Sequence, residues 1–309
     1  MKKNILNLMI ILSFTILLIE VFIHKILIHN TINYSINLWL TALLPTMFPT
    51  FIITDILIHY NITEYIPKKL KKGLKYLFNI SENATTIFLL STISGFPSNA
   101  RNTKTYYEKK LITKKEAEHI LTITHFSNPI FILSTVGCIF LKNKKLGIII
   151  LLSHYLGNIL IGILTRKNNT PSKNYTLQNK QSQKFSKILI QSISSSIDTL
   201  LLILGTLTSF LIVASLIIEN LKLSPYPSTI IKGILEITMG LKELSLLNLS
   251  PLYQTILSTS IISFGGLSVH LQIISQIADT DISYTPFFQA RIFHALISIP
   301  ITLILYFIL

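Results

Sequence analysis

The chain has 309 residues, of which 50% are hydrophobic and only 13% are charged, and its formal net charge is +14. Soluble domains carry about 25% charged residues, so this composition excludes an ordinary soluble protein. The lysines and arginines lie in the connections between apolar spans, as in loops that face anionic lipid, which argues against nucleic acid as a partner. The single cysteine excludes a disulfide framework within the chain and a multi-cysteine metal site.

Apolar stretches long enough to cross a bilayer recur along the whole chain. About 20 apolar residues cross the hydrocarbon core as a helix, so the sequence predicts an all-α, multi-pass membrane protein in the bacterial cell membrane. The N-terminal stretch is too long for a secretory signal and no small-x-small cleavage site follows it, which favours a first spanning helix. The predicted spanning helices are 5–28, 36–60, 119–141, 146–165, 196–218 and 287–309.

Shorter, broken or re-entrant helices are predicted near 86–100, 230–247 and 253–277. Two of them contain glycine-centred breaks, Ser94–Ala100 and Phe264–His270. A break leaves backbone amides and carbonyls unpaired, and hydrocarbon cannot satisfy them, so it persists only inside protein or beside a wet cavity. Two corresponding breaks, one in each half, indicate the binding site of a transporter.

Lysine and arginine in the short connections predict the orientation of the chain. They place the N-terminus, the 61–83 segment and the basic 166–187 linker in the cytoplasm. The basic turn Lys142–Lys145 is then left outside, as the one exception to the rule.

This orientation makes helix 36–60 run opposite to helix 196–218, which predicts an inverted repeat in which Gly95 matches Gly265. Chance similarity between apolar stretches of low complexity is the alternative. The resulting division is an N-terminal transmembrane helix (1–35), a first half (36–165), a cytoplasmic linker (166–187) and a second half (188–309).

The first break combines several features of an anion-binding helix start. Gly95 permits unusual backbone angles, Pro97 suits the beginning of a helix, and Ser98 or Asn99 is placed to cap it. The amides at such a helix start attract anions, and Arg101 adds a bidentate donor for a carboxylate. The alternative is a plain helix cap with Arg101 among the lipid headgroups.

Buried polar residues elsewhere in the spans extend this candidate site. The Asn128 amide precedes the helix-kinking Pro129 and needs partners at that depth, which either a pathway or a neighbouring helix supplies. Glu236 and Thr238 form a polar break in the second half, where Glu236 carries a coupling proton or pairs with a cation such as Arg291.

The second glycine break offers a matching set of donors. Amides after Gly265 and Gly266, together with Ser268 and Gln272, are expected to bind the anion, and His270 lies directly after the break. The zinc, nucleophile-elbow and phosphate-loop signatures of enzymes are absent from the sequence, so we predict no catalytic residues, no metal and no cofactor.

Five motifs in this order resemble the sporulation integral membrane proteins of the YlbJ type, which belong to the wider gate-domain or nucleoside-recognition family. None of the five is specific alone, but together they cover most of the chain from about 36 to 300. The resembling stretches are Leu43–Pro49, Ser94–Ala100, Ser127–Phe131, Glu236–Gly240 and Phe264–Gln272.

The resemblance implies a role in endospore formation. Members of this type are linked to carrying dipicolinate, a small aromatic dicarboxylate, across the outer forespore membrane. The expected function is therefore a permease for a small organic anion, with that anion and the lipid bilayer as partners and with homo-oligomerisation left open. The alternatives are a gate-domain transporter for nucleosides or other small solutes, and a non-transporting membrane scaffold.

Overall fold

The computed structural model describes residues 2–166, 171 and 184–309, and every regular element in these ranges is a helix. Six helical stretches are long and apolar enough to cross a membrane, which confirms the all-α, multi-pass architecture. They are Ile5–Ile23, Lys25–His59, Lys144–Thr165, Phe185–Leu221, Pro251–Ile277 and Thr285–Ile308.

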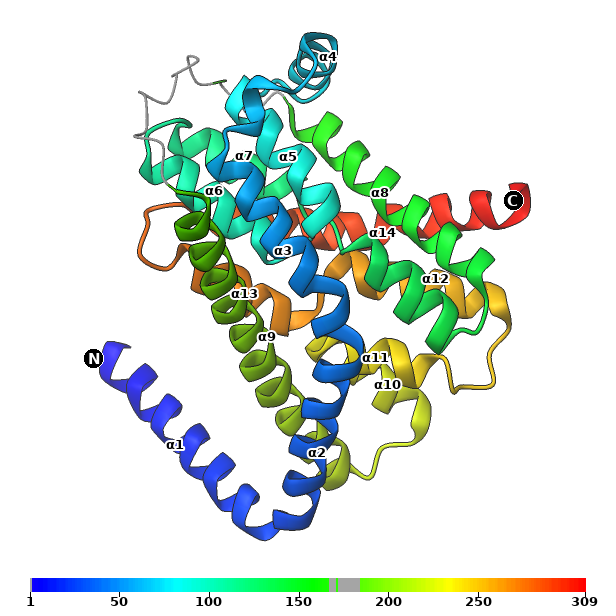
Figure 1. The fold of residues 1–309 in the computed structure, drawn as a ribbon. Coiled ribbons are helices and arrows are strands. Elements are labelled where there is room, and N and C mark those ends of the chain that lie inside the picture. The colour runs from blue at the N-terminus through cyan, green and yellow to red at the C-terminus, as the bar shows by residue number, and fades with distance from the viewer. Residues whose placement is uncertain (1, 167–170, 172–183) are drawn as a thin grey trace.

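The first turn of the chain lies at His24, not between 28 and 36 as the sequence predicted. Helix α1 (Lys2–Ile23) ends there, and Figure 1 shows it projecting away from the other helices. A single 35-residue stretch follows, and it tolerates its two prolines because a π-helical turn shifts the hydrogen bonding just before them. This stretch consists of α2 (Lys25–Leu38), the π-turn η1 (Trp39–Leu43) and α3 (Leu44–His59).

A short connection and a basic amphipathic helix come next. The connection contains a 3₁₀ turn, η2 (Ile62–Glu64), and the helix is α4 (Lys68–Phe78). Phe78 of α4 is fully buried, whereas the lysines lie on the other faces of this helix. Figure 1 shows α4 at one end of the molecule, where the Arg166 guanidinium lies 5.3 Å above the Tyr76 ring.

The first half continues with a helical hairpin and a broken span. Asn83, near the start of the hairpin, donates to the carbonyl of Leu111, just past its end, so the two short helices run antiparallel. The predicted continuous helix 119–141 is wrong, because residues 124–128 are not helical and the helix resumes at Pro129. The elements are α5 (Glu82–Ser94), α6 (Ser98–Glu108), α7 (Lys114–Ile123), the π-helical η3 (Phe131–Phe140) and α8 (Lys144–Thr165).

The second half also contains a hairpin and a broken span. In the hairpin Lys232 pairs with Glu243, and Gly233 contacts Gly240, so the two short helices are antiparallel. The break at Gly265 is a bend between two helices that together cross the bilayer. The elements are α9 (Phe185–Leu221), α10 (Pro225–Leu235), α11 (Ile237–Leu244), α12 (Pro251–Phe264), α13 (Gly266–Ile277) and α14 (Thr285–Ile308).

The two halves share one order of elements: a long span, a hairpin, a broken span and a final span. This order matches the break at Gly95 with the one at Glu236, and the 124–129 break with Gly265. The sequence match of Gly95 with Gly265 is therefore wrong, because the first lies in a hairpin and the second in a broken span. The inverted relation of the halves stays a prediction.

Helix α8 separates the two ends of the molecule. It starts beside the Lys142–Lys145 turn and ends next to Arg166, which contacts α4. Its 22 residues measure about 33 Å, so the turn lies at the end opposite to the 61–83 segment and the start of the linker. In the predicted orientation the Lys142–Lys145 turn likewise lies on the opposite side from these two segments, as the one exception to the rule that basic loops are cytoplasmic. The remaining linker residues, 167–170 and 172–183, lie outside the described residues.

Charged contacts tie the connection between α13 and α14 to α6, and they predict a pH dependence. The Lys104 ammonium donates to Asp279 at 2.6 Å and the Tyr107 hydroxyl donates to Asp281 at 2.6 Å, which lowers the pKa of each carboxyl group. Contacts that lower a carboxyl pKa stabilise the folded state above the ordinary value of about 3.9 and lose this effect as the pH falls below it.

We therefore expect amide hydrogen exchange in the 278–284 connection to accelerate below about pH 4, where both carboxylates take up protons. The variant Lys104→Met should remove part of this acid response, and exchange within the Asn143 turn serves as the internal control. A connection that exchanges equally at pH 3 and pH 6, after correction for intrinsic rates, would contradict the prediction.

Candidate functional site

The two glycine breaks meet at the imidazole ring of His125. This ring stacks on Phe96 of the first break, with centroids 4.6 Å apart and an interplanar angle of 13°. Gly265 of the second break lies beside the Cε1 and Nε2 atoms of this ring, where an added Cβ would stand 2.8 Å from each. The edge of Phe287 approaches to a centroid distance of 5.4 Å. Three segments far apart in sequence therefore converge on one buried histidine.

The first break is built tightly into the fold. Gly95 ends α5 with φ = +75°, and a Cβ there would lie 2.6 Å from the amide nitrogen of Asn128. The Ser98 hydroxyl is used locally, by Ser94 and the carbonyl of Gly95, and Pro97 occupies the position before α6. Ser98 was one of the donors predicted to bind the anion, but its hydroxyl donates within the turn instead.

Gly95 is consequently the position at which we expect a single methyl group to disturb the site. Gly95→Ala forces alanine into the left-handed region and against the Asn128 backbone, so we expect it to lower the free energy of unfolding by about 2 kcal/mol. Thermal denaturation in detergent measures the change. Gly73→Ala, at a helix position with nothing within 4 Å, is the control and should leave the stability unchanged or increase it.

Asn128 fixes the 124–129 break from within the protein. Its side-chain amide donates to the Thr50 hydroxyl at 2.9 Å and lies 3.3 to 3.4 Å from the carbonyls of Thr46, Ile93 and Ser94. Its carbonyl oxygen accepts from the first amides of η3, at 2.9 and 3.2 Å. The sequence left open whether a transport pathway or neighbouring helices supply the partners of the Asn128 amide. In the structure, neighbouring helices supply them.

The second break is held between the two halves. Gly266 has φ = +64°, and its missing side chain lets the amide nitrogen of Ile237, at the tip of the α10–α11 hairpin, come within 3.2 Å of the Cβ position. Glu236 caps α11 by accepting from the amide of Met239 at 2.8 Å, with Thr238 buried beside it. The break and the hairpin tip therefore pack directly against each other.

Three further predicted residues belong to α13. Ser268 is buried in its first turn, and the side-chain amide of Gln272 donates to the Thr206 hydroxyl of α9 at 2.8 Å. His270 bridges the carbonyl of Phe264 and the hydroxyl of Tyr284. A small cavity of about 20 Å³, room for roughly one water, is lined by Gln272, Glu236 and Thr238 together with Phe96.

Arg291 does not pair with Glu236, which corrects the pairing considered from the sequence. It is fully buried on α14 and donates to Asn158, His294 and the carbonyl of Thr122, all of them neutral. Among the described residues no carboxylate forms an ion pair with it. Its positive charge therefore lies uncompensated in the core.

A polar cleft of about 470 Å³ opens at the end of the molecule where α6 ends. Arg101 forms part of its wall, donating to Ser195 and Thr199 of α9 and lying 3.4 Å from a carboxylate oxygen of Asp55. The structure thus places Arg101 in a protein cleft instead of a bare headgroup zone. The cleft is lined by Asp55, Ile58, His59, Arg101, Asn102, Lys104, Thr105, Glu108, Lys109, Gln191, Ser195 and Gln276.

Buried polar atoms without a partner among the described residues extend from this cleft to the breaks. Folded proteins satisfy nearly all buried polar atoms, so each exception needs an explanation. We call this set the unpartnered row: Nε of Arg101, Nδ2 of Asn102, Oδ1 of Asn99, both ring nitrogens of His125 and Oγ of Ser127. Similar single atoms on Tyr34, Ser153, Ser192, Ser258 and Arg291 belong to other helices.

The members of the unpartnered row lie on α6 and in the 124–129 break, and one hydrogen bond links these two segments. Asn99 and Asn102 are one turn apart on α6, and Asn99 donates to the Thr124 hydroxyl at 3.2 Å. Thr124 directly precedes His125. The sequence reasoning found Asn99 and Arg101, but missed His125, whose only signal was its place two residues before Ser127-Asn128-Pro129.

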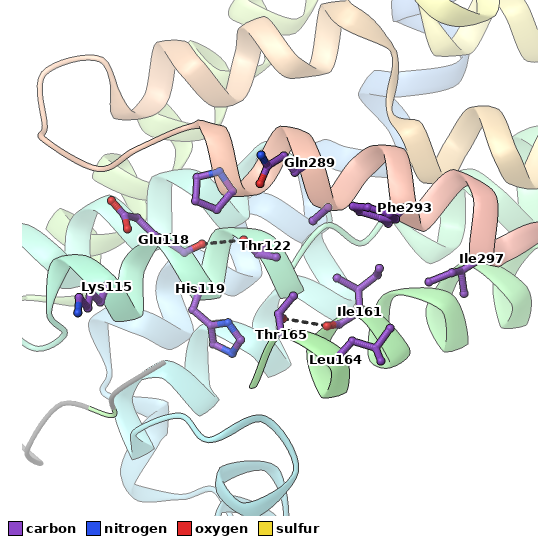
Figure 2. A pocket seen from close by; sticks show the side chains of 12 residues that line it. Lys115, Glu118, His119, Thr122, Ile161, Leu164, Thr165, Gln289, Phe293 and Ile297 are labelled. Carbon is purple, nitrogen blue, oxygen red and sulfur yellow. Dashed lines mark hydrogen bonds between the residues drawn. The ribbon is translucent and has the colours of Figure 1, made fainter. Parts of the chain in front are cut away.

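A groove of about 560 Å³ lies apart from the breaks, between α7, α8 and α14 (Figure 2). Figure 2 shows the hydroxyls of Thr122 and Thr165 bonded to carbonyls of their own helices, while Leu164 and Phe293 cover the opposite walls. None of the predicted site residues lines this groove. Its size alone does not make it the substrate site.

Comparison with known proteins identifies one relative. The chain is 28% identical over 295 residues to the sporulation integral membrane protein YlbJ of Bacillus subtilis (strain 168), a match that covers 84% of this chain and 72% of the relative. No family model and no solved structure matches the chain. The motifs singled out from the sequence and this match agree. The chain is a multi-pass membrane protein related to the YlbJ-type sporulation integral membrane proteins.

Proposed function

We propose that this protein is a permease for a small organic anion, and that the anion is dipicolinate, carried across the outer forespore membrane during sporulation. The observation that supports transport most strongly is the unpartnered row, which joins the polar cleft to the junction of the two breaks. In a protein that only packs helices together, such buried groups cost free energy and return none. In a permease they contact the solute as it passes.

The cleft has the size and the donors for a small carboxylate. Its volume of about 470 Å³ is typical of small-molecule sites. Arg101 and Asn102 each present an unpartnered nitrogen at a buried depth, and such preoriented donors replace the water that a carboxylate loses. Lys104 lies at the same cleft, where its ammonium group pairs with Asp279 and Glu108.

The breaks provide a closed position of the pathway. The cavity between them, of about 20 Å³, is too small for a dicarboxylate, so passage requires the second break to move away from the first. Gly265 and Gly266, both in left-handed conformations, are the backbone positions around which α13 reorients relative to α12. The α10–α11 tip packed on Gly266 moves with it in this proposal.

Uptake into vesicles tests the proposal directly. Purified protein in liposomes should accumulate radiolabelled dipicolinate faster than empty liposomes, and unlabelled dipicolinate should compete better than adenosine or uridine. Competition by nucleosides alone would favour the gate-domain alternative. Transport of neither solute would favour the scaffold.

Substitutions distinguish a role of these residues in solute transport from a role in helix packing. Asn102→Leu should reduce uptake at least tenfold with little change in abundance, because its amide nitrogen has no partner to lose. Asn33→Leu, on the exposed side of α2, is the matched control and should transport normally. The double variant Gly266→Val, Asn99→Ala should be inactive but present in the membrane. Near wild-type uptake in this double variant would show that the breaks are packing devices.

A further inference from the structure

His125 is the one histidine at the junction of the breaks that lacks hydrogen-bond partners. Its neighbours His154, His270 and His294 each use both ring nitrogens. The His154 Nε2 accepts from the amide of Ser127, and His294 Nδ1 accepts from Arg291, so both rings are neutral with a fixed tautomer. Among the described residues, neither nitrogen of the fully buried His125 has a partner.

The fold nevertheless keeps this imidazole in place at a cost. The second break has no side chain at Gly265, and a methyl group there would collide with the ring. Phe96 and Phe287 fix the remaining sides. Two unpaired polar atoms in a core cost free energy, and a phenyl ring of similar shape would avoid this cost. Packing alone therefore does not account for a histidine at this position.

The charges around His125 favour a negatively charged ligand. Arg291 lies 5.2 Å from the centroid of the Phe287 ring, which in turn contacts His125. Its partners are neutral, so the positive charge is uncompensated, and an isolated buried charge is stabilised by an anion that enters its surroundings. Glu236, at the α10–α11 hairpin tip, accepts from the amide of Met239 and forms no ion pair with Arg291 among the described residues.

We propose that the junction of the breaks is an anion subsite in which the N–H group of His125 donates to a carboxylate of the transported solute, while Arg291 supplies the attractive charge. This subsite rests on the proposed permease function and lies at its midpoint. Solute entering from the cleft passes Arg101, Asn102 and Asn99 and reaches His125 when the breaks separate. A side chain at Gly265 would collide with the Cε1–Nε2 edge of the ring, so glycine leaves the room that this edge needs.

Cysteine accessibility tests the subsite independently of the identity of the solute. Cys138 is the single cysteine and is exposed, so Cys138→Ser provides a clean background. In it, His125→Cys should react with the anionic reagent 2-sulfonatoethyl methanethiosulfonate at least tenfold faster than Ser258→Cys. Both positions are 0% exposed, and the Ser258 hydroxyl also lacks a partner, so only membership of a pathway distinguishes them.

Protection by added anions then distinguishes this inference from the proposed substrate. Slower labelling of His125→Cys in the presence of dipicolinate supports both. Protection by phthalate or isophthalate, but not by dipicolinate, supports the subsite and rejects dipicolinate as the solute. Labelling no faster than at Ser258→Cys overturns the subsite.

A stability measurement completes the test. His125→Phe should match or exceed the melting temperature of the wild type, because it removes two unpaired buried atoms, while solute uptake falls at least tenfold. His125→Asn, which keeps an N–H donor, should recover part of the uptake. Wild-type uptake by His125→Phe would overturn the subsite, and if that variant does not accumulate, uptake by His125→Leu, which also lacks an N–H donor, equal to the wild type would do the same.

Discussion

Replacing Gly240 with alanine is expected to disrupt the α10–α11 hairpin and, in the proposed permease, to abolish solute uptake. A Cβ at Gly240 would lie 2.2 Å from the Cα atom of Gly233 and 2.5 Å from its amide nitrogen, so the two helices touch backbone to backbone. Backbone atoms cannot rotate away as a side chain does, and overpacking of this kind costs about 3 kcal/mol. The helices must separate, which displaces the backbone of Ile237 from its place against Gly266.

Unfolding of the purified variant in detergent, followed by circular dichroism, measures this effect. Gly205→Ala is the matched control, because Gly205 lies inside the helix α9 with nothing within 4 Å of a Cβ. It should be neutral or stabilising by up to about 1 kcal/mol. Equal stability of the Gly240 and Gly205 variants would show that α10 and α11 do not cross as closely as the structure has them.

Replacing Asn128 with leucine is expected to be nearly as damaging, for the opposite reason. Leucine fills the space but leaves the first amides of η3 and the end of α5 without the partners that Asn128 provides. Each buried polar group left unpaired costs about 1–3 kcal/mol, so we expect a loss of about 3 kcal/mol in total. The break at 124–129 would no longer hold His125 between Phe96 and Gly265.

The control for this variant is Asn143→Ala at the start of α8. Asn143 also accepts from two backbone amides, at 3.0 and 3.3 Å, but it lies in an exposed turn where water replaces it. Its loss should cost about 1 kcal/mol, as for other helix caps. If denaturation in detergent gives similar losses for both variants, Asn128 is an ordinary cap and the central break does not depend on it.

Local chemistry in the sequence determined the class of this protein and the position of its breaks. A bilayer admits only long apolar helices, so the spans ending near Thr165 and starting near Thr285 follow from composition alone. Gly95 and Gly265 indicated interruptions because serines flank each of them inside an otherwise apolar stretch, and Pro97 follows the first. The motifs around them also indicated the relation to the YlbJ type, which the match to the curated relative confirms.

Other features depended on contacts between distant segments. The apolar run continues through His24, so hydropathy gave no sign of the first turn. Hydrogen bonds from Asn128 to helices far along the chain turned a predicted continuous helix into a broken one. The halves correspond by their hairpins and bends, which residue identity in low-complexity sequence does not report.

The residues of the site divide in the same way. Asn99, Arg101 and Glu236 were found because polar groups in apolar spans are costly wherever the chain folds. The isolation of His125, the neutral partners of Arg291 and the packing of Gly265 against an imidazole 140 residues away along the chain had no signal in the sequence. Whether a buried polar atom has a partner is a property of the packed tertiary structure, because the partner is supplied by another segment.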